Sequence, residues 1–262
     1  MGSETLRFAT FNANSIRVRL PQILNWLVAN EIDLLGVQET KVTDEEFPES
    51  EVRDAGYEVV YRGQKAYAGV AILSREPLTD VAYDLGDDVT DPEPRVLRGA
   101  YRGVRIINTY VPQGREVASE HFEFKLAWLG RVRAMLEAHY RADEPVLWMG
   151  DLNVAPQPVD VYDPEALAEH VDFHPRARAA LAQVIDWGLV DIVREHHPEP
   201  QLYSYWDYRA RNAIQRNMGW RVDHLLASRP LAERCTAAWI DVEARKAERP
   251  SDHTFVAAEF SL

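Results

Sequence analysis

The stretch VLWMGDLNVAP, residues 146–156, shows the pattern from which the fold can be predicted. Its first four residues are apolar, as in a strand that is buried on both faces, and the run ends abruptly at Asp151 and Asn153. Such a strand lies inside a sheet and presents its last side chains at the edge of that sheet. The stretch therefore predicts a buried core strand that carries two candidate functional residues at its end.

The same pattern recurs on both sides of this stretch. Other apolar runs break at Asn12 and Asn14, Gln38 and Glu39, Asn108 and Tyr110, Asp223, and Asp252 and His253. Any one of these residues, taken alone, is most simply a turn or helix-cap residue. Because six such breaks follow runs that are apolar enough to be buried, we interpret them as one rim of a packed scaffold.

The remaining periodicity predicts many strands and a few helices in mixed order. Strands are predicted at residues 6–12, 32–37, 57–61, 69–73, 96–101, 104–111, 145–149, 189–193, 203–206, 221–226, 237–242 and 254–260. Helices are predicted over residues 122–140 and 176–187, and one more has Pro21 in its first turn. This order favours an α/β fold in which sheets pack face to face under an outer cover of helices, as a single domain over residues 1–262.

Composition restricts the class of protein further. Cys235 is the only cysteine, which excludes an intramolecular disulfide and gives no support for an oxidising compartment. No apolar run approaches a membrane span, and the start MGSETLRFATF is too polar for a signal peptide. We expect a cytoplasmic monomer without a membrane partner.

The formal net charge of −13 argues against a nucleic-acid partner, but the charges are unevenly distributed. Residues 94–105 and 208–221 contain no acid. The arginines of these two windows are Arg95, Arg98, Arg102 and Arg105, and Arg209, Arg211, Arg216 and Arg221. Either window alone is equally well explained as solvated surface. Together they predict one cationic face on an acidic body.

The polar residues of the rim favour one kind of chemistry. Oxygen ligands without cysteine clusters or a histidine pair favour Mg²⁺, or Mn²⁺ as the alternative, over zinc. The sequence has no Gly-rich phosphate loop of the Walker type and no Gly-x-Ser-x-Gly elbow. Metal-assisted phosphoester hydrolysis is therefore favoured over acyl transfer and nucleotide-driven motors.

Nine blocks in order give the chain a family resemblance. They are FATFNANSIR, LLGVQETK, YAGVAILSR, INTYVPQG, VLWMGDLNVAP, WGLVD, YSYWDYR, GWRVDHLLAS and PSDHTFV, within residues 8–256. As a set they resemble the signature blocks of the exonuclease III family of AP endonucleases. The resemblance implies a four-layered, deoxyribonuclease I-like α/β sandwich of two mixed sheets with helices outside and the active site at one rim. The blocks WGLVD, YSYWDYR and GWRVDHLLAS separate the DNA-repair branch from other members of the superfamily.

The resemblance also implies a role for each polar residue of the rim. Glu39 would be the principal Mg²⁺ ligand, with Asn12, Asn14 and Asp252 near the metal. Asp151 would orient or deprotonate the attacking water, and Asn153 would fix the position of that water. His253 would donate a hydrogen bond to a phosphate oxygen, with its ring held by Asp223. Tyr110 would donate to the phosphate or to the leaving group.

A third group would bind DNA. Tyr205, Trp220 and Val222 match an apolar pocket for a flipped, base-free deoxyribose, although such an aromatic cluster is by itself more often core. Tyr67 and the window arginines, Arg95 and Arg216 among them, would bind the DNA backbone.

Three positions depart from the family pattern. Phe255 stands where relatives usually have Pro, which changes the stiffness of its loop. Tyr205 puts a phenol where relatives often have Phe or Trp. Asn14 stands where some relatives have Asp, which weakens the argument for a second tightly bound metal.

The function predicted is that of a Mg²⁺-dependent DNA-repair nuclease. It would cut duplex DNA 5′ to abasic sites, with additional 3′-to-5′ exonuclease and 3′-end-cleaning activity. Its partner would be double-stranded DNA with abasic sites or 3′ ends. Two alternatives stay open from the residues alone, a hydrolase of a small phosphoester such as an inositol phosphate and a catalytically silent DNA-binding module.

Overall fold

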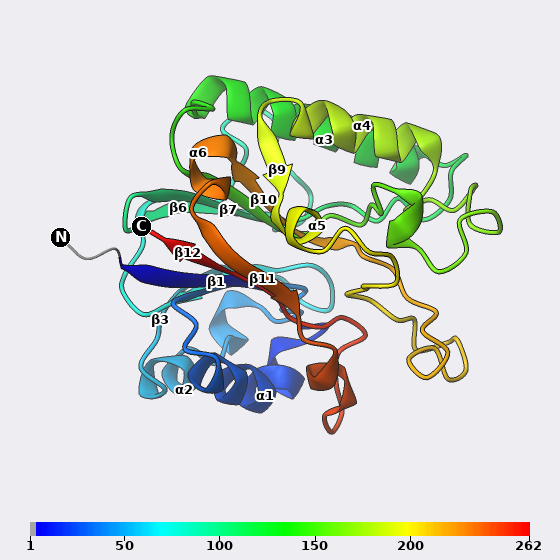
Figure 1. The fold of residues 1–262 in the computed structure, drawn as a ribbon. Coiled ribbons are helices and arrows are strands. Elements are labelled where there is room, and N and C mark those ends of the chain that lie inside the picture. The colour runs from blue at the N-terminus through cyan, green and yellow to red at the C-terminus, as the bar shows by residue number, and fades with distance from the viewer. Residues whose placement is uncertain (1–3) are drawn as a thin grey trace.

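The structure is a computed structural model that describes residues 4–262. Two six-stranded β-sheets pack face to face, and helices cover both outer faces (Figure 1). The first sheet contains β1 (Thr5–Asn12), β2 (Leu34–Gln38), β3 (Glu58–Arg62), β4 (Val70–Ser74), β11 (Cys235–Ile240) and β12 (Val256–Ser261), in the order β11-β12-β1-β2-β4-β3. The second contains β5 (Thr79–Ala82), β6 (Val96–Tyr101), β7 (Val104–Tyr110), β8 (Val146–Asp151), β9 (Leu189–Asp191) and β10 (Asp223–Ser228), in the order β5-β6-β7-β8-β10-β9. The predicted sandwich of two mixed sheets is confirmed.

The helices form the outer layers. The longer ones are α1 (Ile16–Ala29), α3 (Glu120–His139) and α4 (Pro175–Ile185), and the shorter ones are α2 (Glu49–Asp54), α5 (Ile192–His196) and α6 (Arg229–Ala232). Helices α1 and α2 lie below the first sheet in Figure 1, and α3 and α4 lie above the second. None of the helices within residues 4–262 is both long and apolar enough to cross a lipid bilayer.

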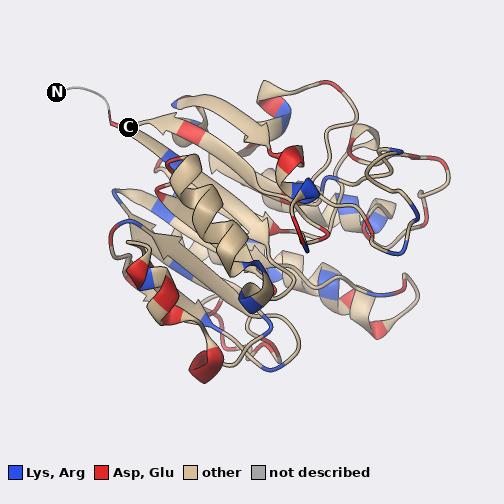
Figure 2. Ribbon diagram, turned by 90° about the horizontal axis from the view of Figure 1, so that it is seen from below, with Lys and Arg blue, Asp and Glu red and all other residues tan. Residues whose placement is uncertain are grey.

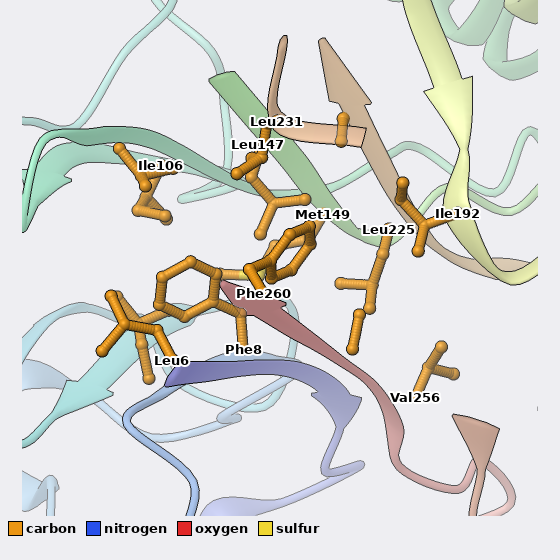
Figure 3. Close-up of a cluster of buried hydrophobic side chains, with 14 of the residues drawn as sticks. Leu6, Phe8, Ile106, Leu147, Met149, Ile192, Leu225, Leu231, Val256 and Phe260 are labelled. Carbon is orange, nitrogen blue, oxygen red and sulfur yellow. The ribbon is translucent and has the colours of Figure 1, made fainter. Parts of the chain in front are cut away.

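An apolar layer between the two sheets holds them together (Figure 3). Phe8 on β1 packs on Phe260 of β12 with ring centroids 5.6 Å apart, and Met149 and Leu225 of the second sheet belong to the same cluster. All residues of β2 and of β8 are buried, because each of these strands has a packed layer on both faces. This explains why their sequences are continuous apolar runs.

A polar bridge crosses this apolar layer close to the rim. Gln38 and Asn108 are fully buried, and the Gln38 amide donates to the Asn108 side-chain oxygen at 2.6 Å. The Asn108 amide donates in turn to the carbonyls of Val37 and Ala71, at 3.1 and 2.9 Å. The interpretation of Gln38 and Asn108 as functional side chains of the rim is therefore wrong, since their hydrogen bonds join the two sheets.

Helix α1 begins earlier than the sequence predicts. Its first residue is Ile16, so Pro21 lies inside the helix rather than in its first turn. The cause is the preceding loop, in which Ser15 N–H donates to the Glu39 carbonyl and Ile16 N–H to the Thr40 carbonyl, at 2.8 and 3.0 Å. Two predicted strands also differ from the structure. The strand predicted at residues 189–193 ends early, because helix α5 begins at residue 192. The strand predicted at residues 203–206 is not formed, and this segment makes only isolated β-bridges.

Candidate active site

Strand direction brings the polar strand ends to one rim. Strands β1 and β2 are parallel, as are β7 and β8, so each pair ends at the same edge of its sheet. Strand β10 runs antiparallel to β8, with Asp223 opposite Asp151, and β12 runs antiparallel to β1. The resulting cluster comprises Asn12 from β1, Glu39 after β2, Tyr110 from β7, Asp151 from β8, Asp223 from β10, and Asp252 and His253 before β12.

Asn12 links the two sheets at the centre of this rim. Its side-chain amide donates to Glu39 Oε1 and to Asp151 Oδ2, at 2.8 Å in each case. Asn12 is fully buried, and its backbone carbonyl accepts a hydrogen bond from Ser251 Oγ at 2.7 Å. One amide thus fixes a carboxylate from each sheet and anchors the loop that carries His253.

Asp151 is held by more than one neighbour. The backbone N–H of Asn153 donates to Asp151 Oδ1 at 3.0 Å, and the Asn153 amide donates to the Val111 carbonyl at 2.9 Å. Burial raises the pKa of Asp151, and the charges of Asp223 and Glu39 raise it further, although His253 acts in the opposite direction. Asp151 is therefore a carboxyl group that can exchange a proton at higher pH than an ordinary aspartate.

His253 is paired with Asp223. Its Nδ1 lies 2.8 Å from Asp223 Oδ2, and Ser204 Oγ donates to the same Oδ2 at 2.6 Å. Burial alone would lower the pKa of His253, but Asp223 and Asp151 outweigh burial and raise it. The ring is thus held as an imidazolium, and its Nε2 lies 3.8 Å from Asp151 Oδ2.

Tyr110 and Arg95 form a further pair at the rim. The Arg95 guanidinium lies over the Tyr110 ring, 4.8 Å from its centroid, and donates to the Tyr110 carbonyl at 3.2 Å. Glu93 forms a salt bridge with Arg95. Burial raises the pKa of the Tyr110 phenol well above its ordinary value, and Glu39 and Asp151 raise it further. Tyr110 therefore keeps its proton and can act as a hydrogen-bond donor.

Glu39 has the surroundings of a cation ligand. Burial alone would raise the pKa of Glu39, but Lys41 and the hydrogen bond from Asn12 outweigh it and lower it. The Lys41 ammonium lies 2.6 Å from Glu39 Oε2 and 2.5 Å from Asn14 Oδ1. Asp252 is tied to the same group, because the Asn14 amide donates to Asp252 Oδ1 at 2.9 Å. The Lys41 ammonium shows that this set of oxygens accommodates a positive charge. Carboxylate and amide oxygens are also the ligands that Mg²⁺ and Mn²⁺ prefer.

A second group of side chains could also hold a metal ion. Asp151, Asp223 and His253 offer ligand atoms that lie within 4.8 Å of one another. Asp223 and His253 are hydrogen-bonded to each other through Nδ1, so this group would bring the His253 ring nitrogen Nε2 to the metal, whereas Mg²⁺ and Mn²⁺ prefer oxygen ligands. The oxygens around Glu39 are therefore the better fit to a hard divalent cation.

A cavity of about 530 Å³ opens beside this cluster. Asp151, Asn153 and His253 line one part of it, and Tyr205, Trp220 and Val222 line another. The Tyr205 ring packs on the His253 ring with centroids 4.7 Å apart. Trp220 and Val222 are 7 % and 3 % exposed, so they are both core residues and walls of the cavity.

A buried ion network supports these walls from behind. Arg221, between Trp220 and Val222 in the chain, is fully buried and binds Asp160 and Asp191 at 2.7 Å each. Its backbone N–H also donates to the Asp160 carbonyl at 2.8 Å. Arg221 therefore has a structural role and does not belong to a DNA-facing surface.

A second cavity of about 640 Å³ lies on the other side of the cluster. Tyr67, which is 69 % exposed, and Arg95 line it. Glu39, Tyr110 and Arg115 line both cavities, so the two cavities lie on either side of these residues.

The arginine windows do not form one cationic face. Arg98, Arg102 and Arg105 of the first window pair with acids elsewhere in the chain, namely Asp84, Glu4 and Glu76, and Asp80. Arg102 lies in the turn between β6 and β7, at the end of the hairpin opposite Tyr110. Figure 2 shows basic and acidic residues interspersed over the ribbon. Arg216 is exposed in the loop that borders the first cavity, and no carboxylate within residues 4–262 pairs with it.

Several residues near the cavities are not indicated by any pattern in the sequence. Arg115 is exposed and lines both cavities, and His170 packs on Trp220 with ring centroids 4.5 Å apart. Lys125 is fully buried, and its ammonium donates to the Asn153 carbonyl at 2.5 Å and to Asp172 Oδ1 at 2.9 Å. Only Lys41 had a sequence signal, since it lies two residues after Glu39.

Comparison with known proteins places the chain among nucleases. The model of the Endonuclease/Exonuclease/phosphatase family matches residues 9–253. Exodeoxyribonuclease III of Haemophilus influenzae is 33 % identical, over 97 % of this chain and 100 % of that protein. An AP endonuclease from Archaeoglobus fulgidus has a TM-score of 0.96 and 44 % identity, over 98 % of this chain and 100 % of that one. A 3′ phosphatase from Neisseria, solved with a product DNA hairpin, has a TM-score of 0.94 and 36 % identity over the same shares.

Proposed function

The chain belongs to the endonuclease/exonuclease/phosphatase family, and from this premise we propose that it is a DNA-repair nuclease. It hydrolyses the phosphodiester on the 5′ side of an abasic site in duplex DNA and leaves a 3′-hydroxyl. It also removes nucleotides and blocking groups from 3′ ends. One observation carries the proposal, namely that Asp151, Asn153 and His253 share a cavity with the apolar wall formed by Trp220 and Val222.

The protein groups divide the hydrolysis between them. Asp151 orients the attacking water and accepts its proton, and Asn153, fixed to the Val111 carbonyl, holds Asp151 in place through its backbone N–H. The His253 imidazolium donates from Nε2 to a phosphate oxygen, since Nδ1 is occupied by Asp223. Tyr110 donates its phenolic proton to the phosphate or to the leaving oxygen. All four groups are held before substrate arrives, which lowers the cost of reaching the transition state.

We assign the divalent cation, Mg²⁺ or alternatively Mn²⁺, to Glu39, with Asn14, Asn12 and Asp252 nearby. When bound, it offsets the negative charge that develops on the phosphate and on the leaving oxygen. Glu39 suits this role because it remains ionised despite being largely buried.

The apolar wall provides selection for damage. A nucleotide without a base has already lost pairing and stacking, so turning its sugar out of the helix costs less than flipping an intact nucleotide. Trp220, backed by His170, and Val222 form a wall that suits a bare deoxyribose. Tyr67 and Arg115 line the adjoining cavity, where they would contact the DNA on the other side of the scissile phosphate.

A nicking assay tests the proposal. The protein is incubated with a duplex that carries one abasic analogue, with the same duplex undamaged, and with an inositol phosphate, each with and without EDTA. We expect a single EDTA-sensitive cut 5′ to the analogue, absent from Asp151→Asn. Hydrolysis of the inositol phosphate without nicking would refute the proposal, and so would nicking that persists in Asp151→Asn.

A further inference from the structure

Lys41 makes contacts that the hydrolysis proposed above does not require. Its ammonium lies 2.6 Å from Glu39 Oε2 and 2.5 Å from Asn14 Oδ1, and both of these oxygens belong to the proposed cation site. The side chains of Lys41 and Glu39 are 26 % and 17 % exposed, so water screens this pair less than it would a surface pair. The chain therefore supplies a cation of its own at the place where a metal is expected.

The backbone is built to produce this arrangement. Asn14, Glu39 and Lys41 adopt positive φ angles of 45°, 51° and 55°, a region that residues with a Cβ seldom occupy. The two loops that carry them are joined by hydrogen bonds from Ala13 N–H to the Gln38 carbonyl and from Ser15 N–H to the Glu39 carbonyl, at 2.9 and 2.8 Å. Such conformations persist where the surrounding structure enforces them, and the Lys41 N–H also donates to the Ala68 carbonyl at 3.1 Å, so the backbone from which the Lys41 side chain extends is fixed.

We propose that Lys41 is a tethered counter-ion of the metal site, an inference that rests on the proposed function. Without metal, the ammonium pairs with the Glu39 carboxylate and keeps it aligned with Asn14. A divalent cation competes with the ammonium for Glu39 Oε2 and Asn14 Oδ1, because two positive charges in this partly screened site repel each other strongly. Metal binding therefore displaces Lys41, and Lys41 weakens the affinity for metal while stabilising the metal-free protein.

The direct test measures metal affinity on the DNA-free protein. Mn²⁺ binding is followed by the electron paramagnetic resonance signal of free Mn²⁺, for the parent, Lys41→Met, Lys41→Gln and Lys41→Arg. We expect Lys41→Met and Lys41→Gln to bind Mn²⁺ at least tenfold more tightly and Lys41→Arg to resemble the parent. Lys246→Met is the matched control, since Lys246 is also ion-paired, with Glu243, but lies outside the site.

A second readout uses stability instead of binding. In EDTA, Lys41→Met should melt at a lower temperature than the parent, and Mn²⁺ should raise its melting temperature more than it raises that of the parent, because a ligand stabilises the folded state in proportion to its affinity. Unchanged or weaker Mn²⁺ binding by both Lys41→Met and Lys41→Gln would overturn the inference. If Glu39→Gln nevertheless abolishes Mn²⁺ binding, the proposed metal site stands and only the role of Lys41 is wrong. A parent protein that binds no Mn²⁺ would overturn both.

Discussion

His253 lies between two carboxylates, with its Nδ1 2.8 Å from Asp223 Oδ2 and its Nε2 3.8 Å from Asp151 Oδ2. The ring comes from the loop before β12, whereas both carboxylates come from the second sheet. The relationship therefore exists only when the two sheets are packed together. It links Asp151, the proposed proton acceptor, to His253, the proposed cationic donor, whose pKa Asp223 raises.

Replacing Asp223 by Asn should remove this cation. Among the neighbours that raise the pKa of His253, Asp223 has the largest effect, so without that charge the pKa of the ring should fall. We expect the rate of the chemical step to fall roughly 10²- to 10³-fold, within the range for loss of one acid–base group. Single-turnover nicking and an NMR titration of the ring check this, with exposed Asp186→Asn as control. An unshifted His253 titration would contradict the assigned pairing.

Glu39→Gln and Asp151→Asn should have different effects. Glu39→Gln should lower activity and raise the Mg²⁺ concentration required, because it weakens the proposed metal ligand. Asp151→Asn should abolish turnover and leave DNA binding largely unchanged, because it removes chemistry rather than contact. Activity titrated against Mg²⁺ and a DNA-binding titration separate the two. Full activity of either variant at low Mg²⁺ would refute its assigned role.

DNA affinity should depend steeply on salt despite the net charge of −13. Each phosphate contact contributes about 0.9 to the slope of log affinity against log salt. Arg115→Ala and Arg216→Ala should each flatten the slope by about that amount, since both side chains are exposed, Arg115 in the lining of the first cavity and Arg216 in a loop that supplies other residues to it. Arg102→Ala, which removes only two ion pairs distant from the cavities, with Glu4 and Glu76, should leave the slope unchanged. A slope of zero in the parent would instead indicate a small phosphoester substrate.

The buried ion network predicts how stability responds to acid. Burial alone would raise the pKa of Asp191, but Arg221 and His224 outweigh it and hold the pKa well below its ordinary value. Asp191 therefore stabilises the fold above its unfolded-state pKa of about 3.9, and this contribution is lost as the pH falls through that value towards the folded-state pKa.

The corresponding variant is Asp191→Asn. It should lower the free energy of unfolding on the order of 3 kcal/mol at pH 7, as when one partner of a buried pair is removed. The difference from the parent should shrink as the pH is lowered from 5 towards 3, measured by denaturant unfolding. Asp143→Asn, which breaks only an exposed pair with Arg141, should leave stability nearly unchanged. A difference that does not depend on pH would argue against an ionised Asp191.

Much of the site could be predicted because its residues are anchored by local sequence. An apolar run that breaks at a carboxylate places that group at a sheet edge. This pattern predicts Glu39, Asp151 and Asp223 as residues of the rim. The same rule was wrong for Gln38 and Asn108, because it cannot tell whether a polar side chain points out of the rim or across to the other sheet. The register of the strand decides which way the side chain points, and the packing of the two sheets fixes that register.

Charge pairing between distant segments could not be predicted. Arg98 and Arg105 lie in an acid-free window, yet they pair with Asp84 and Asp80 because strand β5 lies beside β6. Phe255 shows the same limit for a single residue. The resemblance implies Pro at this position, and the Phe255 ring stacks between Phe11 and Trp26, with centroids 4.0 Å from each. The change therefore anchors the His253 loop in the core, a role that only the three-dimensional structure shows.

Trp220 tests the central claim most directly, because it belongs to the wall of the cavity and not to the chemistry. The measurement is nicking of abasic and undamaged duplexes side by side by the parent and by Trp220→Ala, with a melting curve to establish that the variant is folded. Loss of an aromatic contact of this kind costs about 1–3 kcal/mol, so abasic nicking should fall roughly tenfold to a hundredfold. Discrimination between the two duplexes should fall with it, while the Mg²⁺ requirement stays the same. A folded variant that discriminates as well as the parent would show that Trp220 is only a core residue and that the cavity does not recognise the lesion.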